Sequence, residues 1–73
     1  MKNMSQLTNF VLNGHSYYIL EKINLFDLIN YFDYNDSLLV IEHNNLICNK
    51  KKWKEIFIKN EDKIEIVTIV GGG

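Results

Sequence analysis

The dipeptide Asn13-Gly14 constrains the fold more than any other feature of this sequence, because it lies between two runs of strand-forming residues. Asn and Gly readily adopt the positive φ angles of a type I′ turn, which joins two antiparallel strands through only two residues. We predict a strand over residues 8–12 and a return strand over residues 15–20, which is rich in aromatic and β-branched side chains. A β-hairpin therefore opens the fold, after a loose polar segment at residues 1–6.

One amphipathic helix is predicted after the hairpin. Asn24 can cap its amino end, and Asp27 three residues later gives the pattern of a capping box. Phe26 and Tyr31 lie off the apolar stripe of this helix, so we expect them to be partly exposed. The helix should end near Asp33. The stripe itself, which should face the core, consists of Leu25, Leu28, Ile29 and Phe32.

Three further strands are predicted in the second half of the chain. Residues 38–41 form a compact apolar run that continues towards His43, and the turn Asn44-Asn45 leads into a short strand at residues 46–48. The last strand covers residues 64–70 and is apolar on both faces after Glu65. Strands of this kind usually lie centrally in a sheet and are covered by a helix or a second layer.

The segment before the last strand combines a lysine-rich stretch with short apolar pieces. Residues 50–54 are predicted to form a loop or one helical turn, with Trp53 packed onto the sheet edge. Residues 56–58 read as a short extended piece, and residues 60–62 as a polar turn. One helix packed on one face of a mixed sheet of four to five strands is the economical arrangement, so we expect an α+β fold.

Size and composition narrow the class of protein. The 73 residues make one domain, and a chain this short buries only about 60% of its unfolded surface. A net charge of -1 argues against a nucleic-acid partner, and no segment is apolar for long enough to span a membrane. The run of lysines at residues 50–52 is expected to be solvated. Abundant Asn, Lys and Ile indicate an A/T-rich genome, which fits low-GC bacteria and plastids.

No catalytic set can be assembled from the sequence. His15 and His43 are isolated, so we expect surface or hydrogen-bonded histidines, and Glu61-Asp62 is better interpreted as a turn than as a metal site. The single cysteine, Cys48, can form neither an internal disulfide nor a metal cluster, and fits a part-buried core position in a reducing compartment. We therefore expect no catalytic residue, no bound metal and no bound cofactor, and we do not expect an enzyme.

The carboxyl end carries the chemistry that remains. Three of the four glycines form the terminal run Gly71-Gly72-Gly73. Residues without side chains make a thin, flexible tail, whose carboxylate can enter an active site too narrow for other residues. Condensation of the Gly73 carboxylate with ATP would give an acyl-adenylate, from which a sulfur nucleophile on a partner could displace AMP and leave sulfur on the terminus. A frayed terminus is the alternative interpretation.

Four stretches carry a resemblance to a known family: the Asn13-Gly14 hairpin, the capped helix at residues 24–29, the strand, turn and strand at residues 40–47, and the run DKIEIV at residues 62–67 followed by the glycine tail. From Phe10 to Gly73 the chain resembles the ThiS-type sulfur carriers of thiamine biosynthesis, small β-grasp proteins of the ubiquitin-like superfamily. Trp53 matches an aromatic residue that the family often carries. The chain departs from the family at Cys48 and Asn49, where Pro and Arg are frequent, and at Glu61, where Gly is frequent.

The resemblance implies a single β-grasp domain over residues 1–73 and an ATP-dependent, E1-like activating enzyme that adenylates Gly73. It implies a sulfur relay that starts from cysteine through a desulfurase and converts the terminus to a thiocarboxylate. The acceptor would be thiazole synthase, which builds the thiazole half of thiamine. Gly71 and Gly72 would be the slender neck, and an apolar sheet face beside the last strand would be the docking surface. The expected location is the cytoplasm, or the plastid stroma if the gene is plastid-encoded.

Three other interpretations share parts of this pattern. The small subunit of molybdopterin synthase has the same fold and thiocarboxylate chemistry but a different acceptor. A ubiquitin-like modifier would join Gly73 to lysines of target proteins. A plain interaction module would not need its terminal glycines, so its activity would survive the removal of Gly72 and Gly73.

Overall fold

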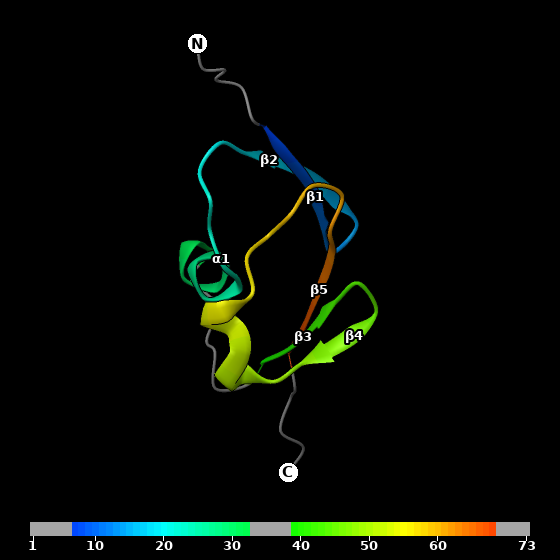
Figure 1. Ribbon diagram of the computed structural model, residues 1–73. Helices are drawn as coiled ribbons and strands as arrows, with labels where there is room; N and C mark the ends of the chain where they lie inside the picture. The colour runs from blue at the N-terminus through cyan, green and yellow to red at the C-terminus, as the bar shows by residue number, and fades with distance from the viewer. Residues whose placement is uncertain (1–6, 33–38, 69–73) are drawn as a thin grey trace.

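Five strands in the described part of the chain form one mixed sheet, in the order β2-β1-β5-β3-β4 (Figure 1). The computed structural model describes residues 7–32 and 39–68. The strands β1 to β5 are Thr8–Leu12, His15–Ile19, Leu39–His43, Leu46–Cys48 and Lys63–Thr68. β5 runs parallel to β1 and antiparallel to β3, while β1–β2 and β3–β4 are antiparallel hairpins. The helix α1 (Leu25–Tyr31) and the 3-10 helix η2 (Lys50–Glu55) lie together beside this sheet, which confirms the predicted α+β class.

Both hairpins turn through two residues with positive φ. Asn13 and Gly14 have φ angles of 49° and 83°, and the register pairs Leu12 with His15, as predicted for a type I′ turn. Asn44 and Asn45 repeat the arrangement between β3 and β4, with φ angles of 54° and 73°. Asn is among the few residues other than Gly that adopt this region readily, so the asparagine-rich composition is used at the turns.

Glu61 also has a positive φ angle, of 69°, in the turn that leads into β5. Its backbone N–H donates a hydrogen bond to the carbonyl oxygen of Asn9 at 2.6 Å, which fixes this turn to the start of β1. An L-residue in the left-handed region costs about 1–2 kcal/mol relative to its preferred conformations. The resemblance implies glycine at this position, and the backbone conformation found here also favours glycine.

We expect Glu61→Gly to stabilise the protein by about 0.5–1 kcal/mol, because the relief of the left-handed conformation exceeds the extra entropy that glycine gains in the unfolded chain. The control is Glu61→Ala, which removes the same carboxylate but keeps a Cβ. Chemical denaturation of the three proteins gives the comparison. A Gly variant no more stable than the Ala variant would contradict this account of the turn.

The amino end of α1 is capped as predicted. Asn24 accepts a hydrogen bond on Oδ1 from the backbone N–H of Asp27 at 2.7 Å, and Asp27 accepts one on Oδ2 from the backbone N–H of Asn24 at 3.2 Å. The helix has only 7 residues, so tertiary packing rather than intrinsic propensity must stabilise it. Phe32 follows as the carboxyl cap, and the predicted end near Asp33 lies outside the described residues.

Trp53 lies deeper in the molecule than predicted. The expectation was a position against the sheet edge, but its side chain is only 1% exposed and belongs to the core, because η2 packs against α1 (Figure 1). The indole Nε1 has no hydrogen-bond partner within the described structure. The other core residues come from all the layers: Phe10, Leu12, Leu25, Leu28, Ile29, Ile41, Ile58, Ile64 and Ile66.

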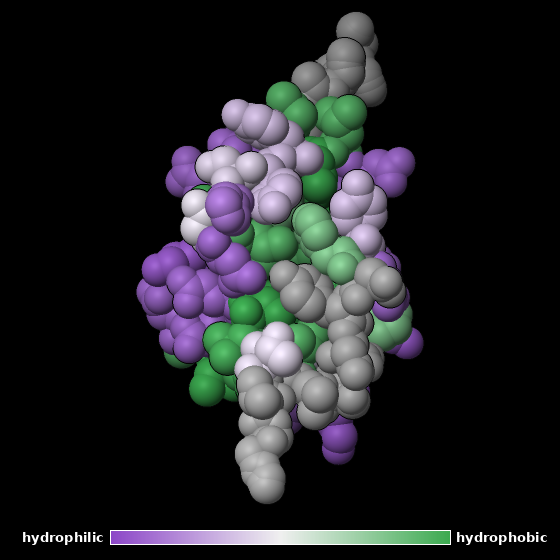
Figure 2. All heavy atoms as spheres, turned by 180° about the vertical axis from the view of Figure 1, so that it is seen from behind, coloured by the Kyte–Doolittle hydropathy of each residue, from purple (hydrophilic) through white to green (hydrophobic). Residues whose placement is uncertain are grey.

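The central position of β5 is confirmed, and the strand is covered by helices on one face, while part of its apolar surface is left exposed. Ile64 and Ile66 are buried, whereas Val67 is 51% exposed and Thr68 is also exposed. The helices cover one face of the sheet, and strands with antiparallel partners tolerate an open second face. Seen from behind, apolar surface runs down the middle of the molecule between polar flanks (Figure 2). The predicted strand ends at residues 38 and 69–70 lie outside the described residues.

Candidate functional site

The predicted site begins where the described structure ends. Gly71, Gly72 and Gly73 lie outside the described residues, and Thr68 is the last residue of β5. The last glycines follow the end of β5, which is the middle strand of the sheet. The described residues therefore show how the tail is anchored and which surface lies beside it.

β5 is paired over nearly its whole length on one side and only at its start on the other. On one side β3 pairs with it from His43 opposite Ile64 to Leu39 opposite Thr68. On the other side β1 pairs only with its first two residues and then turns away into the hairpin. Asn13 replaces the missing strand there, since its Oδ1 accepts a hydrogen bond from the N–H of Ile66 at 2.8 Å. The turn residue that predicts the hairpin thus also holds the outgoing strand.

Asp62 is a buried residue, 5% exposed, and its carboxylate fixes the start of β5. Its Oδ2 accepts hydrogen bonds from the backbone N–H of Lys59 and from Nε2 of His43, both at 2.8 Å. Its Oδ1 accepts one from Nδ2 of Asn44 at 3.0 Å. Asn44 in turn accepts a hydrogen bond on Oδ1 from the N–H of Lys63 at 2.8 Å. This Asp62 cluster joins the β3–β4 turn to the loop before β5.

The Asp62 cluster has a structural role rather than a catalytic one. Burial by itself would raise the pKa of Asp62, but the hydrogen bonds from Lys59, Asn44 and His43 and the charge of His43 outweigh burial, and its pKa lies below the usual value of 3.8. The carboxylate is therefore ionised and fully engaged at neutral pH, and it is not a proton donor. His43 is hydrogen-bonded, as expected, and the turn at Glu61-Asp62 is confirmed.

The open face of the sheet presents an apolar surface next to the end of β5. Val67 lies directly opposite Val40 of β3. Val67 follows buried Ile66 and Val40 precedes buried Ile41, so both valine side chains lie on the face away from α1. Ile47 of β4 is 72% exposed and lies opposite Glu42 on the same face. We call Val40, Ile47 and Val67, together with Glu42 and Glu65, the open-face patch.

An acidic pair lies in the middle of the open-face patch. Glu42 and Glu65 are directly opposite each other in the β3–β5 register, and both are half-buried. Like charges in directly opposed positions destabilise a sheet by about 0.2–1 kcal/mol. This arrangement was missed in the sequence, although the alternation of Glu65 with Ile64 and Ile66 is the signal that would place it on the outer face.

The remaining candidate residues are not brought together. His15 is exposed on β2, and the lysines at residues 50–52 are exposed on η2, which agrees with the expected solvated run. Cys48 is part-buried against the core, and burial raises the pKa of its thiol, although a backbone hydrogen bond at His43 opposes this effect. Among residues 7–32 and 39–68 no three His, Cys, Asp or Glu side chains gather to hold a metal. Nor does this part of the chain contain a helix of the length and hydrophobicity needed to cross a membrane.

Comparison with protein families and known sequences gives a consistent set of matches. The ThiS family model matches residues 10–73, a stretch that includes the last glycine. A protein of Trieres chinensis, "Uncharacterized protein ycf40", is 62% identical over 73 residues, which are 100% of both chains. A protein of the same name from Porphyra purpurea is 37% identical over 62 residues, 85% of this chain and 87% of that one. The sulfur carrier protein ThiS of Bacillus subtilis is 34% identical over 47 residues, 64% of this chain and 71% of its own.

A solved structure confirms the fold. The crystal structure of the thiamine biosynthesis protein ThiS from Geobacter metallireducens matches with a TM-score of 0.79 at 20% sequence identity. The match covers 90% of this chain and 100% of the other. The shared architecture is the predicted β-grasp, with a mixed sheet and one α-helix on one face.

Proposed function

Because the chain belongs to the ThiS family of sulfur carriers, we propose that it carries sulfur as a thiocarboxylate on Gly73 and donates it to thiazole formation in thiamine biosynthesis. The observation that carries this proposal is the family match, which extends through the final glycine and through the central strand that holds the tail. Since residues 7–32 and 39–68 bring no cluster of three His, Cys, Asp or Glu together, we assign the chemistry to partners, with the chain as their co-substrate.

The proposed loading takes place in three steps on the terminal carboxylate. An E1-like activating enzyme transfers AMP from ATP to a carboxylate oxygen of Gly73, and pyrophosphate leaves. A sulfur nucleophile, supplied from cysteine through a desulfurase relay, then attacks the acyl carbon and displaces AMP. Attack by a relay persulfide gives an acyl disulfide, and a thiol reductant then cleaves its S–S bond. The thiol leaves as a disulfide with the relay cysteine, and the terminus keeps one sulfur in place of one oxygen. In this scheme ATP is a substrate of the activating enzyme, and the reaction requires no cofactor on the chain itself.

The length of the tail suits delivery into a partner. Five residues follow Thr68, and fully extended they span at most about 18 Å. Gly71 and Gly72 add no side chains to the last part of that reach, so a channel only as wide as the backbone admits the terminus. β5 is held by β3 and by Asn13. A partner that binds the folded domain therefore also fixes the position of Thr68, from which the tail continues.

We assign the docking of the activating enzyme to the open-face patch, because it flanks the strand from which the tail emerges. Val40, Val67 and Ile47 offer apolar contact area, and the exposed Val67 lies one residue before the end of β5. Glu42 and Glu65 add a concentrated negative charge that a Lys or Arg of the partner would neutralise. Binding would then relieve the repulsion within the acidic pair.

Replacing both acids, Glu42→Gln together with Glu65→Gln, should raise the KM of the activating enzyme for the chain about tenfold, because the charge attraction is lost. The same change should raise the free energy of unfolding by about 0.5 kcal/mol, since two opposed like charges are removed. Glu55→Gln on η2, where the carboxylate is 70% exposed, is the matched control. An unchanged KM in the double variant would exclude these acids from the docking surface.

The acceptor distinguishes this proposal from its nearest rival. Thiocarboxylated chain mixed with thiazole synthase and its other substrates should yield thiazole phosphate, whereas the large subunit of molybdopterin synthase should not be supplied with sulfur. Transfer only to the latter would assign the chain to molybdopterin synthesis, and isopeptide-linked conjugates in cells would assign it to protein modification. We place the reaction in a reducing compartment, the cytoplasm or the stroma of a plastid that encodes the chain.

A further inference from the structure

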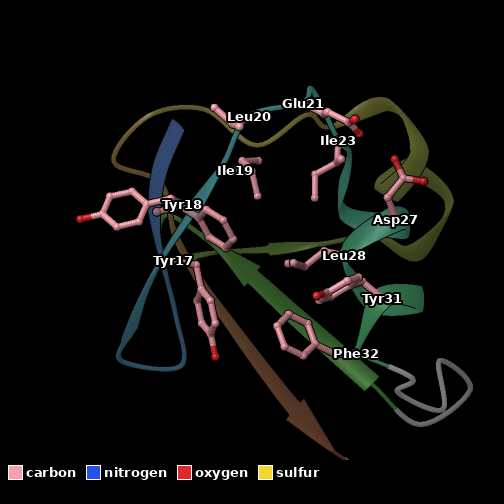
Figure 3. A pocket seen from close by; sticks show the side chains of 11 residues that line it. Tyr17, Tyr18, Ile19, Leu20, Glu21, Ile23, Asp27, Leu28, Tyr31 and Phe32 are labelled. Atoms are coloured by element: carbon pink, nitrogen blue, oxygen red, sulfur yellow. The ribbon is translucent and has the colours of Figure 1, made fainter. Parts of the chain in front are cut away.

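We propose that the groove between β2 and α1 binds an extended segment of a partner protein, which adds as a strand to the free edge of β2 and carries both apolar and basic side chains. The groove is open and has a volume of about 660 Å³. In Figure 3 side chains from β2 and from α1 face one another across it, with those of Leu20, Glu21 and Ile23 from the connecting segment between them. This proposal does not rest on the sulfur chemistry of Gly73.

Apolar and aromatic side chains line the groove. Phe10 and Tyr17 stack with ring centroids 5.8 Å apart, and Tyr17 meets the edge of Phe32 at 5.6 Å, so aromatic rings close one end. Leu20 and Tyr31 stand on opposite rims and are 72% and 80% exposed. Large apolar side chains left in water on both rims of one groove are typical of a binding surface rather than of a finished core.

The β2 edge offers hydrogen bonds in register with these side chains. Among the described strands, β2 lies at one edge of the sheet and neighbours β1 alone. In a two-residue hairpin the pair that flanks the turn, Leu12 and His15, exchanges hydrogen bonds, and the pattern then alternates. Ser16 and Tyr18 therefore direct their backbone N–H and C=O groups outward. A strand that pairs with them would place alternate side chains over the groove.

The charges of the groove select a basic occupant. Glu21 and Asp27 line it towards the same end in Figure 3, and neither Lys nor Arg is among the described residues that line it. Asp27 uses Oδ2 in the capping box, which leaves Oδ1 for a partner. A second copy of the chain is a poor occupant, because its β2 contains neither Lys nor Arg and so offers no basic side chain to Glu21 and Asp27.

The groove is separate from the open-face patch, to which we assign the docking of the activating enzyme. It lies at the β2 edge on the side of α1, whereas the open-face patch lies on the other face, over β3, β4 and β5. Both surfaces can therefore be occupied at once. A carrier that must be recognised by more than one protein gains from a second contact that leaves the terminus free.

The test uses the full chain and two labelled synthetic peptides that alternate valine or isoleucine with a charged residue, lysine in one and glutamate in the other. Fluorescence anisotropy should show the lysine peptide binding at least about tenfold more tightly than the glutamate peptide. Glu21→Lys should weaken the lysine peptide about tenfold, and Leu20→Ala should weaken both. Leu46→Ala, equally exposed at the opposite edge of the sheet, is the matched control and should change neither.

Amide hydrogen exchange tests the mode of binding. The lysine peptide should slow exchange at the N–H groups of Ser16 and Tyr18, because strand addition engages them. Equal affinity for the two peptides, an effect of Leu46→Ala as large as that of Leu20→Ala, or unchanged exchange at Ser16 and Tyr18 would each overturn the proposal. Sedimentation of the chain without peptide tests whether it forms a dimer. If it does, and if Glu21→Lys strengthens that dimer, a second copy occupies the groove instead of a partner protein.

Discussion

Deletion of Gly73 is expected to reduce sulfur loading at least about 100-fold while the body stays folded. The shortened chain still ends in a glycine carboxylate, but that carboxylate is displaced by one residue, about 3.5 Å, from the position that the docked body gives it. Misplacement of a reacting group by even about 1 Å can cost a factor of about 100 in rate. The measurement is the initial rate of thiocarboxylate formation with a fixed amount of activating enzyme.

A further variant tests whether loading depends on the width of the tail as well as on its length, and a second one serves as a control. Gly72→Trp keeps the length of the tail but adds a side chain that a narrow channel excludes, so loading should fall as far as in the deletion. Cys48→Ser should load normally, because its part-buried thiol, whose pKa is raised by burial, is not the acceptor of the transferred sulfur. Circular dichroism of each variant checks that the fold is retained. Loading that survives both tail changes would show that the glycines are incidental.

Asp62→Ala is expected to destabilise the protein by about 3 kcal/mol, a large share of the stability of a chain of this size. The change removes a buried charge and leaves the N–H of Lys59, the amide of Asn44 and the ring of His43 without their acceptor. Denaturant titration at neutral pH provides the comparison. Glu55→Ala, which removes an exposed carboxylate, should change stability by less than about 0.5 kcal/mol. Similar losses in the two variants would contradict the role of the Asp62 cluster.

The pH dependence provides an independent check on Asp62. Its folded-state pKa lies below the unfolded value of 3.8, so the folded protein holds the ionised form more tightly. The resulting stability is fully present above pH 3.8 and is lost as the pH falls through the lower, folded-state pKa. Asp62→Asn should therefore lose less stability than the wild type over this acidic range. An equal acid-induced loss in both proteins would show that other carboxyl groups cause it.

Local signals in the sequence predict most of the architecture. Asn13-Gly14 determines the first hairpin, Asn44-Asn45 the second, and the capping box at Asn24 and Asp27 the start of α1, because each signal acts through neighbouring residues. Each of these predictions is confirmed. The resemblance to ThiS-type carriers adds the topology, which the solved ThiS structure confirms.

Features that depend on distant residues were predicted less well. Trp53 is buried because η2 packs against α1, and Val67 is exposed because no layer covers the second face of the sheet; neither follows from local pattern. The Asp62 cluster combines residues up to 19 positions apart, so only the folded chain brings its partners together. The site residues Gly71 to Gly73 remain a prediction from the sequence, supported by a family match that reaches the last residue.

The most direct test of the sulfur-carrier function is the intact mass of the full chain after incubation with its activating enzyme, ATP and a sulfur source. Replacement of one terminal oxygen by sulfur should appear as a single mass increase, and fragmentation should place it on Gly73. Omission of ATP should abolish this mass increase. An unchanged mass, in a mixture where a ThiS protein of known activity becomes thiocarboxylated through its own activating enzyme, would contradict the claim that this chain carries sulfur on its terminus.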